Sequence, residues 1–385
     1  MYPRISDFIN DIFGTQFIWP MQSYGFFLAL AFVAGGYVVW LELSRKEQEG
    51  LLPARKMMPE TKYSGLIDKL VTFLSGFILG FKLFLLFDDY NLFASDPQAG
   101  LMSLDGNLWW GLVGGGLLLG LNLYYEKTFS STRTKEEFFR PRQHTAVIIL
   151  IAAVTGIIGA KIFHLFENPD EFIKDPAGSL LSFDGLTFYG GLIVAAVAVA
   201  WYGNRNGIHW RMLGDSVAPA LILAYGIGRM GCHVAGDGDW GIVNLMEKPG
   251  WLFFLPDWLW AYDYPNNILR EGIPIPDCAG PYCFRLEEPV FPTPLYETTL
   301  CLIIFGGLWK LRRRISIPGM LFALYLIANG IERFTIEQIR INNTFNFFGL
   351  TVTQAQLISV ALIAGGLLMV WWFFRNPVIN NKSND

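Results

Sequence analysis

Long apolar runs separated by short polar segments extend from residue 22 to residue 374. A helix that crosses a bilayer needs ~20 mostly apolar residues. Several of the runs are rich in glycine, which lets helices pack closely in lipid. The pattern predicts an all-α polytopic membrane protein with about nine transmembrane helices. The expected spans are about 22–43, 66–87, 107–125, 145–166, 186–203, 212–231, 295–311, 317–338 and 353–374.

The composition supports a membrane protein. Only 16% of the 385 residues are charged and 52% are apolar, whereas ~25% are charged in an ordinary soluble domain. The 29 basic and 33 acidic residues give a net charge of -4, without the basic excess of a nucleic-acid-binding protein. Nucleic acid is therefore excluded as the main partner. Residues 1–20 lack an apolar run, so we expect no cleavable signal peptide.

Basic residues alternate between successive loops. Loop 44–65 has five Lys or Arg residues, whereas loop 88–106 has none and contains four Asp residues. The alternation keeps its phase, because loops 126–144, 204–211 and 310–314 are again basic. Since cytoplasmic loops carry the excess of Lys and Arg, we expect the N-terminus outside the cell and the C-terminus inside it.

The segment between spans six and seven, residues 242–293, is too long for a bare connection. It contains several tryptophans, which favour the membrane interface, so we interpret it as an external cap. Cys278 and Cys283 lie within it, on the oxidising side of the membrane, and a disulfide between them is expected. Two free thiols are the alternative. Cys232 and Cys301 fall in or beside spans and are interpreted as packing residues.

The chain contains an internal repeat. A shift of 79 residues aligns 80–111 with 159–190 and gives thirteen identities in thirty-two positions, among them shared Lys, Asp-Pro and Asp-Gly residues. Each copy is a two-span hairpin, so both copies point the same way, unlike the inverted repeats of many transporters. The chain then divides into 1–65 (first span and cytoplasmic loop), 66–125 (first hairpin copy), 126–211 (second copy with flanking loops), 212–241 (sixth span), 242–293 (cap) and 294–385 (last three spans and tail).

Charged residues within spans are expensive and indicate function by default. Span six ends with Arg229, and span eight carries Asn329, Arg333, Glu337 and Arg340 at steps of 4, 4 and 3. This spacing places the last four on one helical stripe that faces the bundle interior. The net positive charge suits a phosphate or another anion. A snorkelling arginine and a structural ion pair are the alternative interpretations.

Depth along the helices places these groups together. Arg229 and Arg333 both lie ~24 to 26 Å from the inner ends of their spans at a rise of 1.5 Å per residue. Lys161, late in an outward-running span, reaches the same level, as do Tyr24 and Tyr189, early in inward-running spans. We therefore expect a single site in the outer leaflet.

These motifs resemble the prolipoprotein diacylglyceryl transferase family. The family's Gly-Arg-x-Gly-Asn signature, continuing to an acidic residue and Trp-Gly, is similar to 228–241, and its Arg-x-x-x-Glu-x-x-Arg matches Arg333, Glu337 and Arg340. Further likenesses are Tyr24-Gly25, the hairpin 159–185 with Lys161 in place of Arg, and Pro292-Thr293-Pro294-Leu295-Tyr296-Glu297. The departures are Tyr189 in the family's His-Gly-Gly, Cys232 for its Asn, Asn329 for its Tyr, one inserted residue in 237–239 and two spans beyond the usual seven.

The resemblance implies transfer of diacylglyceryl from phosphatidylglycerol to the lipobox cysteine of preprolipoproteins. Membrane lipid and preprolipoprotein signal peptides would be its partners, and the bacterial cytoplasmic (inner) membrane its location. Arg229 and Arg333 are candidates to stabilise the leaving phosphate, and His233, Asp237 or Tyr189 to serve the thiol. We expect no cofactor and no metal. Candidate substrate-binding residues are Tyr24, Lys161, Gly190, Gly191, Gly241, Glu297, Asn329, Glu337 and Arg340.

Two alternatives stay open. The first is a paralogue of the same fold with another acceptor or reduced activity, which the replaced His and Asn favour. The second is a transporter, which only the repeat favours. The parallel orientation of the repeat and the gathering of charges at one membrane face count against it.

Overall fold

The computed structural model describes residues 1–17, 19, 21–52, 55–56, 62–83, 106–129, 138–174, 179, 187–278, 280–342, 344–347 and 350–376. The chain forms two compact units. The first comprises Met1–Gly14, Gln22–Leu52 and Pro141–Asp385, and the second comprises Thr15–Met21 and Pro53–Arg140.

Each of the nine expected spans overlaps an α-helix among the described residues. Among the described residues, four helical segments are long and apolar enough to cross a membrane, namely Ser23–Gln48, Pro141–Glu167, Trp210–Ala235 and Gln354–Arg375. The chain is thus a mainly helical membrane protein, and the count of nine spans stays a prediction. The nine helices are α2 (Ser23–Gln48), α3 (Lys62–Leu83), α7 (Leu108–Phe129), α8 (Thr145–Glu167), α11 (Phe188–Arg205), α12 (Trp210–Ala235), α13 (Thr293–Leu311), α14 (Met320–Ile336) and α15 (Gln354–Arg375).

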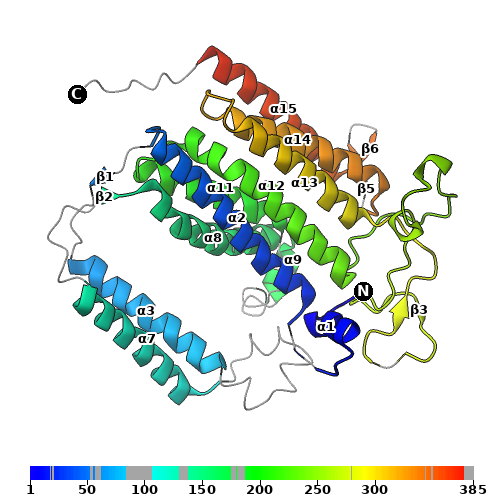
Figure 1. The fold of residues 1–385 in the computed structure, drawn as a ribbon, viewed down its shortest axis with the longest axis horizontal. Helices are drawn as coiled ribbons and strands as arrows, with labels where there is room; N and C mark the ends of the chain where they lie inside the picture. The colour runs from blue at the N-terminus through cyan, green and yellow to red at the C-terminus, as the bar shows by residue number, and fades with distance from the viewer. Residues whose placement is uncertain are drawn as a thin grey trace. The chain divides into compact units, whose positions relative to one another are not determined.

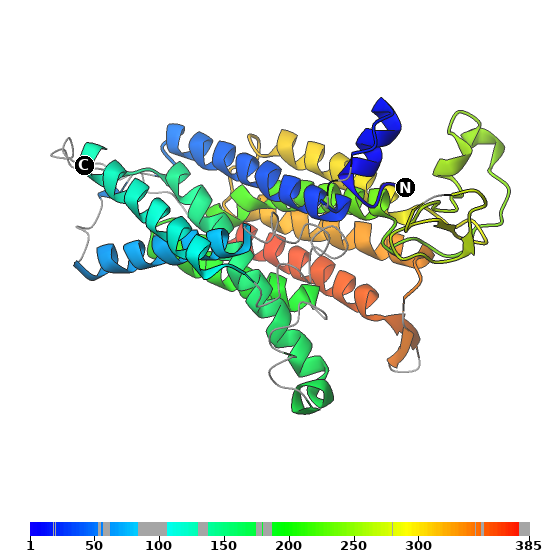
Figure 2. The same ribbon diagram turned by 90° about the horizontal axis from the view of Figure 1, so that it is seen from below.

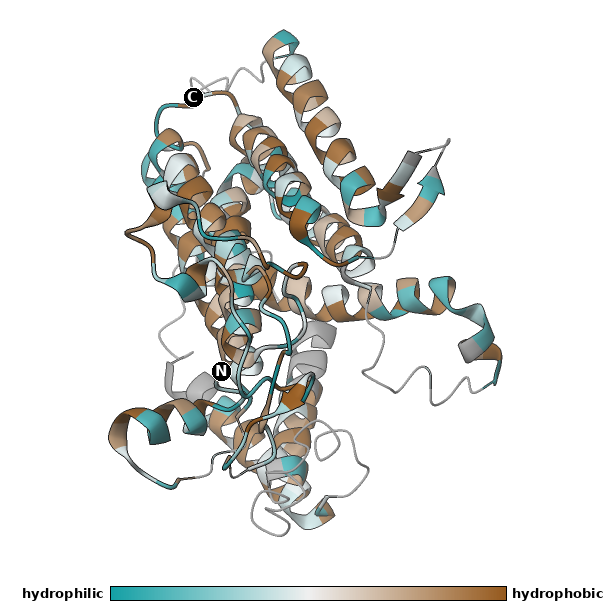
Figure 3. Cartoon of the chain, turned by 90° about the vertical axis from the view of Figure 1, so that its right-hand side faces the viewer, coloured by the Kyte–Doolittle hydropathy of each residue, from teal (hydrophilic) through white to brown (hydrophobic). Residues whose placement is uncertain are grey.

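Helix α12 is the centre of the first unit. It packs against α2 on one side and α13 on the other, while α14 contacts α12, α13 and α15. Figure 1 shows these helices side by side with similar axis directions. Small and apolar side chains fill the contacts, including the fully buried Ile222 and Cys301. Along α15, hydrophilic residues mark both ends and apolar ones the middle (Figure 3), as expected for a helix in lipid.

The hairpin of α8 and α11 is held together by glycines. A Cβ atom at Gly159 would lie 2.6 Å from the carbonyl oxygen of Gly190, and one at Gly191 would lie 2.7 Å from that of Gly156. Helix backbones that approach this closely leave no room for a side chain. Gly190 and Gly191 therefore have a packing function in this contact.

The second unit contains a helix pair, α3 and α7, with a similarly close contact at glycines. A Cβ atom at Gly80 would lie 2.1 Å from the carbonyl oxygen of Trp110, and one at Gly111 would lie 2.8 Å from the Phe77 ring. Gly80 and Gly111 are the positions that the 79-residue shift aligns with Gly159 and Gly190. The two helix pairs are thus built alike. The Asp-Pro motifs of both copies lie outside the described residues.

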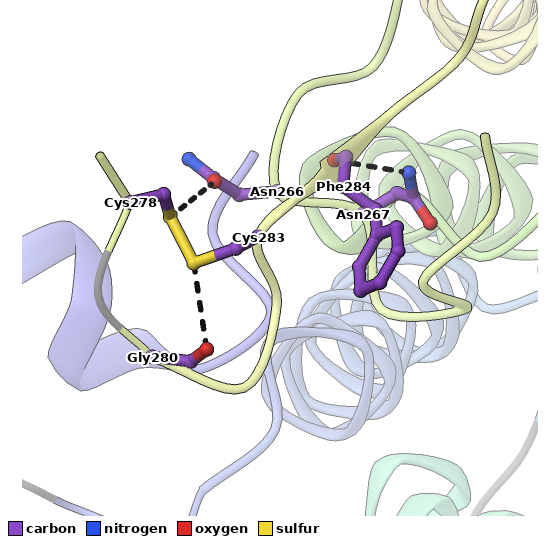
Figure 4. Close-up of a disulfide and its surroundings, with 6 residues drawn as sticks. All are labelled: Asn266, Asn267, Cys278, Gly280, Cys283 and Phe284. Carbon is purple, nitrogen blue, oxygen red and sulfur yellow. Dashed lines mark hydrogen bonds between the residues drawn. A yellow bond between two sulfur atoms is a disulfide. The ribbon is translucent and has the colours of Figure 1, made fainter. Parts of the chain in front are cut away.

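The segment between α12 and α13 has no long helix. It contains the 3-10 turns η3 (Gly250–Leu252) and η4 (Asp257–Leu259) and an antiparallel pair, β3 (Ile273–Pro274) and β4 (Phe284–Arg285). Figure 2 shows its loops gathered beyond one end of the bundle of the first unit. Cys278 and Cys283 form a disulfide beside β4, near the place where the Asn267 amide donates to the Phe284 carbonyl at 3.3 Å (Figure 4).

The apolar pattern did not predict the smaller elements. An antiparallel hairpin of β5 (Thr344–Phe347) and β6 (Leu350–Thr353) precedes α15, and a short helix, α1 (Ile5–Phe13), precedes α2. The alternation of Thr and apolar residues in 350–353 is typical of a strand, but this segment is too short to resemble a span. The remaining elements are β1 (Arg55–Lys56) paired with β2 (Phe138–Phe139), η2 (Pro141–His144), α9 (Pro169–Lys174) and η5 (Glu337–Ile339).

Candidate active site

The end of α12 directs a short loop across the end of the bundle. Gly236 closes the helix in the left-handed conformation, with its N–H donating to the Cys232 carbonyl. Gly241 is packed so tightly that a Cβ atom would lie 2.5 Å from the Ile339 carbonyl oxygen. The hydroxyl of Thr293 also donates to the Asp239 carbonyl at 2.9 Å. The loop 237–241 is therefore fixed between α13 and the segment that follows α14.

Glu297 joins the charged residues at this end of the bundle. Its carboxylate is fully buried on α13 and accepts hydrogen bonds from Arg229 at 3.2 Å, Arg340 at 3.1 Å and the Tyr225 hydroxyl at 2.8 Å. Arg333 lies 3.6 Å from the same carboxylate. A fully buried carboxylate with these partners positions guanidinium groups.

Asp239 is the second carboxylate that the arginines share. Its two oxygens pair with Arg229 and Arg340, respectively. Burial alone would raise the pKa of Asp239, but the two guanidinium groups outweigh burial and lower it. The side chain is therefore ionised at neutral pH. The motif predicts Asp239 only as an acidic residue. Its pairing with Arg340 could not be predicted from the sequence, since the two residues are 101 positions apart.

Arg333 is the most exposed arginine of the cluster. It lies 3.6 Å from Glu297, farther than Arg229 or Arg340, and pairs with Glu337 at 3.2 Å. Its side chain is 20% exposed, against 10% for Arg229 and 9% for Arg340. The Tyr189 phenol is hydrogen-bonded to it. Arg333 and Tyr189 are thus the groups best placed to meet a ligand.

The stripe of polar residues expected on span eight is helical only in its first part, because α14 ends before Arg340. Helix α14 ends at Ile336 rather than near 338, and Arg340 has extended backbone with φ -98° and ψ 153°. Glu337 pairs with Arg333 and accepts a bond from Asn342 at 2.7 Å, and the partners of Arg340 are Glu297 and Asp239. The expected excess of unpaired positive charge is corrected, because each of the three arginines pairs with at least one of the carboxylates of Glu297, Asp239 and Glu337. Pairing offsets part of the cost of burying charges.

Asp237 and Cys232 lie next to this cluster. The Asp237 carboxylate is hydrogen-bonded to the Cys232 thiol and accepts the backbone N–H of Asp239 at 3.4 Å. Burial and the neighbouring Asp239 carboxylate raise the pKa of Asp237. Tyr24, 41% exposed at the start of α2, is close enough to interact electrostatically with Arg229 and Asp239. A carboxylate with a raised pKa is suited to accept a proton.

Cys232, Asp237 and Asp239 also have the ligand types of a metal site, with their ligand atoms within 4.8 Å of one another. Both oxygens of Asp239 are already paired with guanidinium groups, however, and Arg229 Nη1 lies 3.5 Å from the Cys232 sulfur. A cation here would be adjacent to two positive charges. These three residues therefore do not fit a metal site.

His233 faces the cap rather than the arginines. Its Nδ1 lies 3.2 Å from the Tyr264 hydroxyl, and its ring packs against the rings of Tyr262 and Tyr264. Tyr264 is itself buried against Trp240. The structure therefore brings Asp237, but not His233, next to the charged cluster.

Two further candidates lie on neighbouring helices. Asn329 is half-buried on α14, one helical turn before Arg333, and Lys161 is half-buried on α8, two residues after the packing residue Gly159. Asn329 thus adjoins the cluster along its own helix, whereas Lys161 belongs to the helix pair that carries Tyr189.

Comparison with known proteins identifies the family. A family model described as prolipoprotein diacylglyceryl transferase matches residues 109–372. The chain belongs to this family. The match includes every candidate site residue except Tyr24, and it confirms the resemblance noted in the sequence motifs.

Three relatives named phosphatidylglycerol–prolipoprotein diacylglyceryl transferase are similar to this chain over more than half of its length. The protein of Symbiobacterium thermophilum is 32% identical over 245 residues, which cover 61% of this chain and 78% of the relative. That of Pseudomonas aeruginosa is 27% identical over 289 residues, covering 71% and 92%. That of Xylella fastidiosa is 30% identical over 246 residues, covering 58% and 74%.

Proposed function

We propose that this chain transfers the diacylglyceryl group of phosphatidylglycerol to the lipobox cysteine of preprolipoproteins. The observation that carries the proposal is the convergence of Arg229, Arg333 and Arg340 on the buried Glu297 at one end of the bundle. The relatives are named for this activity. We extend it to this chain because the chain belongs to the same family.

The reaction sets the task of each group. The bond from the glyceryl carbon to the phosphate oxygen breaks, a carbon–sulfur bond forms, the thiol loses its proton, and glycerol phosphate leaves as a phosphomonoester. Charge on phosphate grows as this bond breaks, so fixed guanidinium groups stabilise the transition state more than the diester. Arg333 contacts the phosphate, with Tyr189 donating a hydrogen bond beside it. Arg229 and Arg340 hold the carboxylates that fix this arrangement.

Asp237 accepts the thiol proton. A free thiol has a pKa of ~8.5 and needs a base or a positive field to become a nucleophile. Asp237 already makes a hydrogen bond to a thiol, that of Cys232, and its raised pKa favours proton transfer. His233, turned toward Tyr264, shapes the cap instead.

The site faces the outer leaflet of the bacterial cytoplasmic membrane, in a protein with nine spans, the N-terminus outside and the C-terminus inside. Support comes from the helices that coincide with the nine apolar segments and from the basic loops at 44–65 and 310–314. Arg229 and Arg333 lie near the C-terminal ends of α12 and α14, and Tyr24 and Tyr189 near the N-terminal ends of α2 and α11. This placement puts all four at the opposite end from those loops.

Depletion of the protein in its own cells tests the proposal. Preprolipoproteins should then accumulate without lipid, and a plasmid copy of the chain should restore lipidation. Undiminished lipidation after depletion would favour the second candidate, a paralogue with reduced activity or another acceptor. Tyr189 and Cys232, which replace family residues, are the features that favour this alternative.

A further inference from the structure

A polar cavity lies at the end of the first unit opposite the arginine cluster. It has a volume of about 230 Å³ and is formed by the end of α2, the first turns of α12, and the connection between α13 and α14. A single water needs only ~10–15 Å³ of such space. The cavity is therefore large enough for a phosphate group with a substituent.

Four basic side chains line this cavity, namely Arg45, Lys46, Arg312 and Arg313. The lining also contains two acidic residues, Glu49 and Asp215. The cavity wall thus has more positive than negative side chains. The active-site cluster, by contrast, balances its arginines with carboxylates.

The acidic residues near the cavity already have hydrogen-bond or ion-pair partners within the protein. Asp215 accepts the N–H groups of Gly319 at 2.7 Å and Phe322 at 2.9 Å, so it caps the start of α14. Glu49 pairs with Arg45 at 2.7 Å. The fully buried Glu42 behind the wall pairs with Arg45 at 2.9 Å and Arg312 at 2.6 Å. These carboxylates hold the basic side chains in place.

Two basic side chains in the cavity wall, Lys46 and Arg313, have N–H groups available for a ligand. The Lys46 ammonium is buried and donates to the Met212 carbonyl at 2.6 Å and the Ser216 hydroxyl at 2.8 Å, which leaves its third N–H. Arg313 is exposed and has no acidic partner in the part of the chain that the structure describes. A phosphate could accept from both groups.

The rest of the cavity wall is mainly apolar. Leu51, Ile317 and Leu321 line the same cavity, and the Arg312 guanidinium lies over the Trp309 ring at 3.2 Å from its centroid. The cavity therefore has a basic side and an apolar side, and it lies at the ends of helices α2, α12, α13 and α14. Basic pockets between helix ends on the cytoplasmic side are suited to anionic lipid headgroups.

We propose that this cavity binds the phosphate of an anionic phospholipid through Lys46 and Arg313, at a site separate from the active site. The proposal does not depend on the transferase activity. Free inorganic phosphate offers the same acceptor oxygens as a lipid phosphate. The experiment below distinguishes the lipid from the free ion.

The test is amide hydrogen exchange of the full chain in phosphatidylcholine nanodiscs, with and without phosphatidylglycerol, read over residues 312–318. The anionic lipid should slow exchange in this segment at least about threefold, because binding stabilises the bound conformation. Arg313→Gln should remove most of this protection. Arg314→Gln, the exposed neighbour outside the cavity, should keep it.

Inorganic phosphate added to pure phosphatidylcholine nanodiscs forms the second arm. Lipid-dependent protection without an effect of phosphate supports a lipid site. Protection by phosphate alone overturns the lipid assignment. Equal exchange in all conditions, or equal protection in Arg313→Gln and Arg314→Gln, overturns the site itself. Either failure leaves the proposed transferase activity untouched, since that activity is measured separately.

Discussion

At the scale of single residues, the base that deprotonates the substrate thiol should be the side chain that lies next to the arginine cluster. Asp237 has a raised pKa and contacts a thiol, whereas His233 faces the aromatic side chains of the cap. We expect Asp237→Asn to lower the transfer rate by ~10²–10⁴-fold. A base must be ionised, so the wild-type rate should rise with pH through the raised pKa of Asp237, and this acidic limb should be lost in the variant.

His233→Ala is the matched comparison. It should retain the acidic limb, because His233 does not contact the reacting groups. A pH–rate profile of both purified variants gives the answer. If Asp237→Asn keeps the limb and His233→Ala loses it, the histidine is the base and the assignment from the structure is wrong.

Tyr189 should act as a hydrogen-bond donor rather than a base, since a free phenol has a pKa of ~10. Tyr189→Phe then loses one hydrogen bond to a charged group, ~1.5 to 3 kcal/mol, or about one to two decades of rate. Steady-state kinetics with phosphatidylglycerol as the varied substrate would measure the loss. A variant without any activity would indicate that the phenol itself transfers a proton.

The arginine stripe shows what a single sequence can predict about the site. The spacing of Arg333 and Glu337 placed them one helical turn apart, and they do pair. The pairing of Asp239 with Arg340 could not be predicted, because it depends on where α14 ends and on a loop fixed by Thr293 and Gly241. Local periodicity carries no information about such long-range contacts.

At the scale of elements, the apolar runs predicted the helices to within a few residues, as in α13, which was expected over 295–311 and occupies Thr293–Leu311. Hydrophobic length is a strong signal in membrane proteins. The β5–β6 hairpin and α1 were missed because their short segments carry little apolar length.

The disulfide of the cap is a prediction at the same scale. Cys278 and Cys283 should be joined in the mature protein, because the cap lies on the oxidising side of the membrane in the proposed topology. Peptide mass mapping should find both cysteines protected from alkylation until a reductant is added. Alkylation of both without reduction would refute the bond.

At the scale of the whole molecule, the topology follows from loop charge. A membrane-impermeant thiol reagent applied to intact cells should label a cysteine placed at Asn168 and miss one placed at Asn206, which lies in a basic loop. Labelling should reach Asn206→Cys only after the membrane is permeabilised. The reverse pattern would invert the bundle and place the arginine cluster on the cytoplasmic side.

The central claim, that the arginine cluster drives diacylglyceryl transfer, is tested most directly by one assay. Purified protein is given phosphatidylglycerol and a lipobox peptide, and mass spectrometry follows thioether formation together with glycerol phosphate release. Wild type should form both products. Arg333→Ala should lose about a hundredfold or more, because it removes a donor to the leaving phosphate. Arg229→Ala should lose a similar factor, because it removes the partner of Glu297 and Asp239 that fixes the cluster. Arg205→Ala, at the far end of α11, should keep normal activity. Near-normal transfer by both cluster variants would contradict the account.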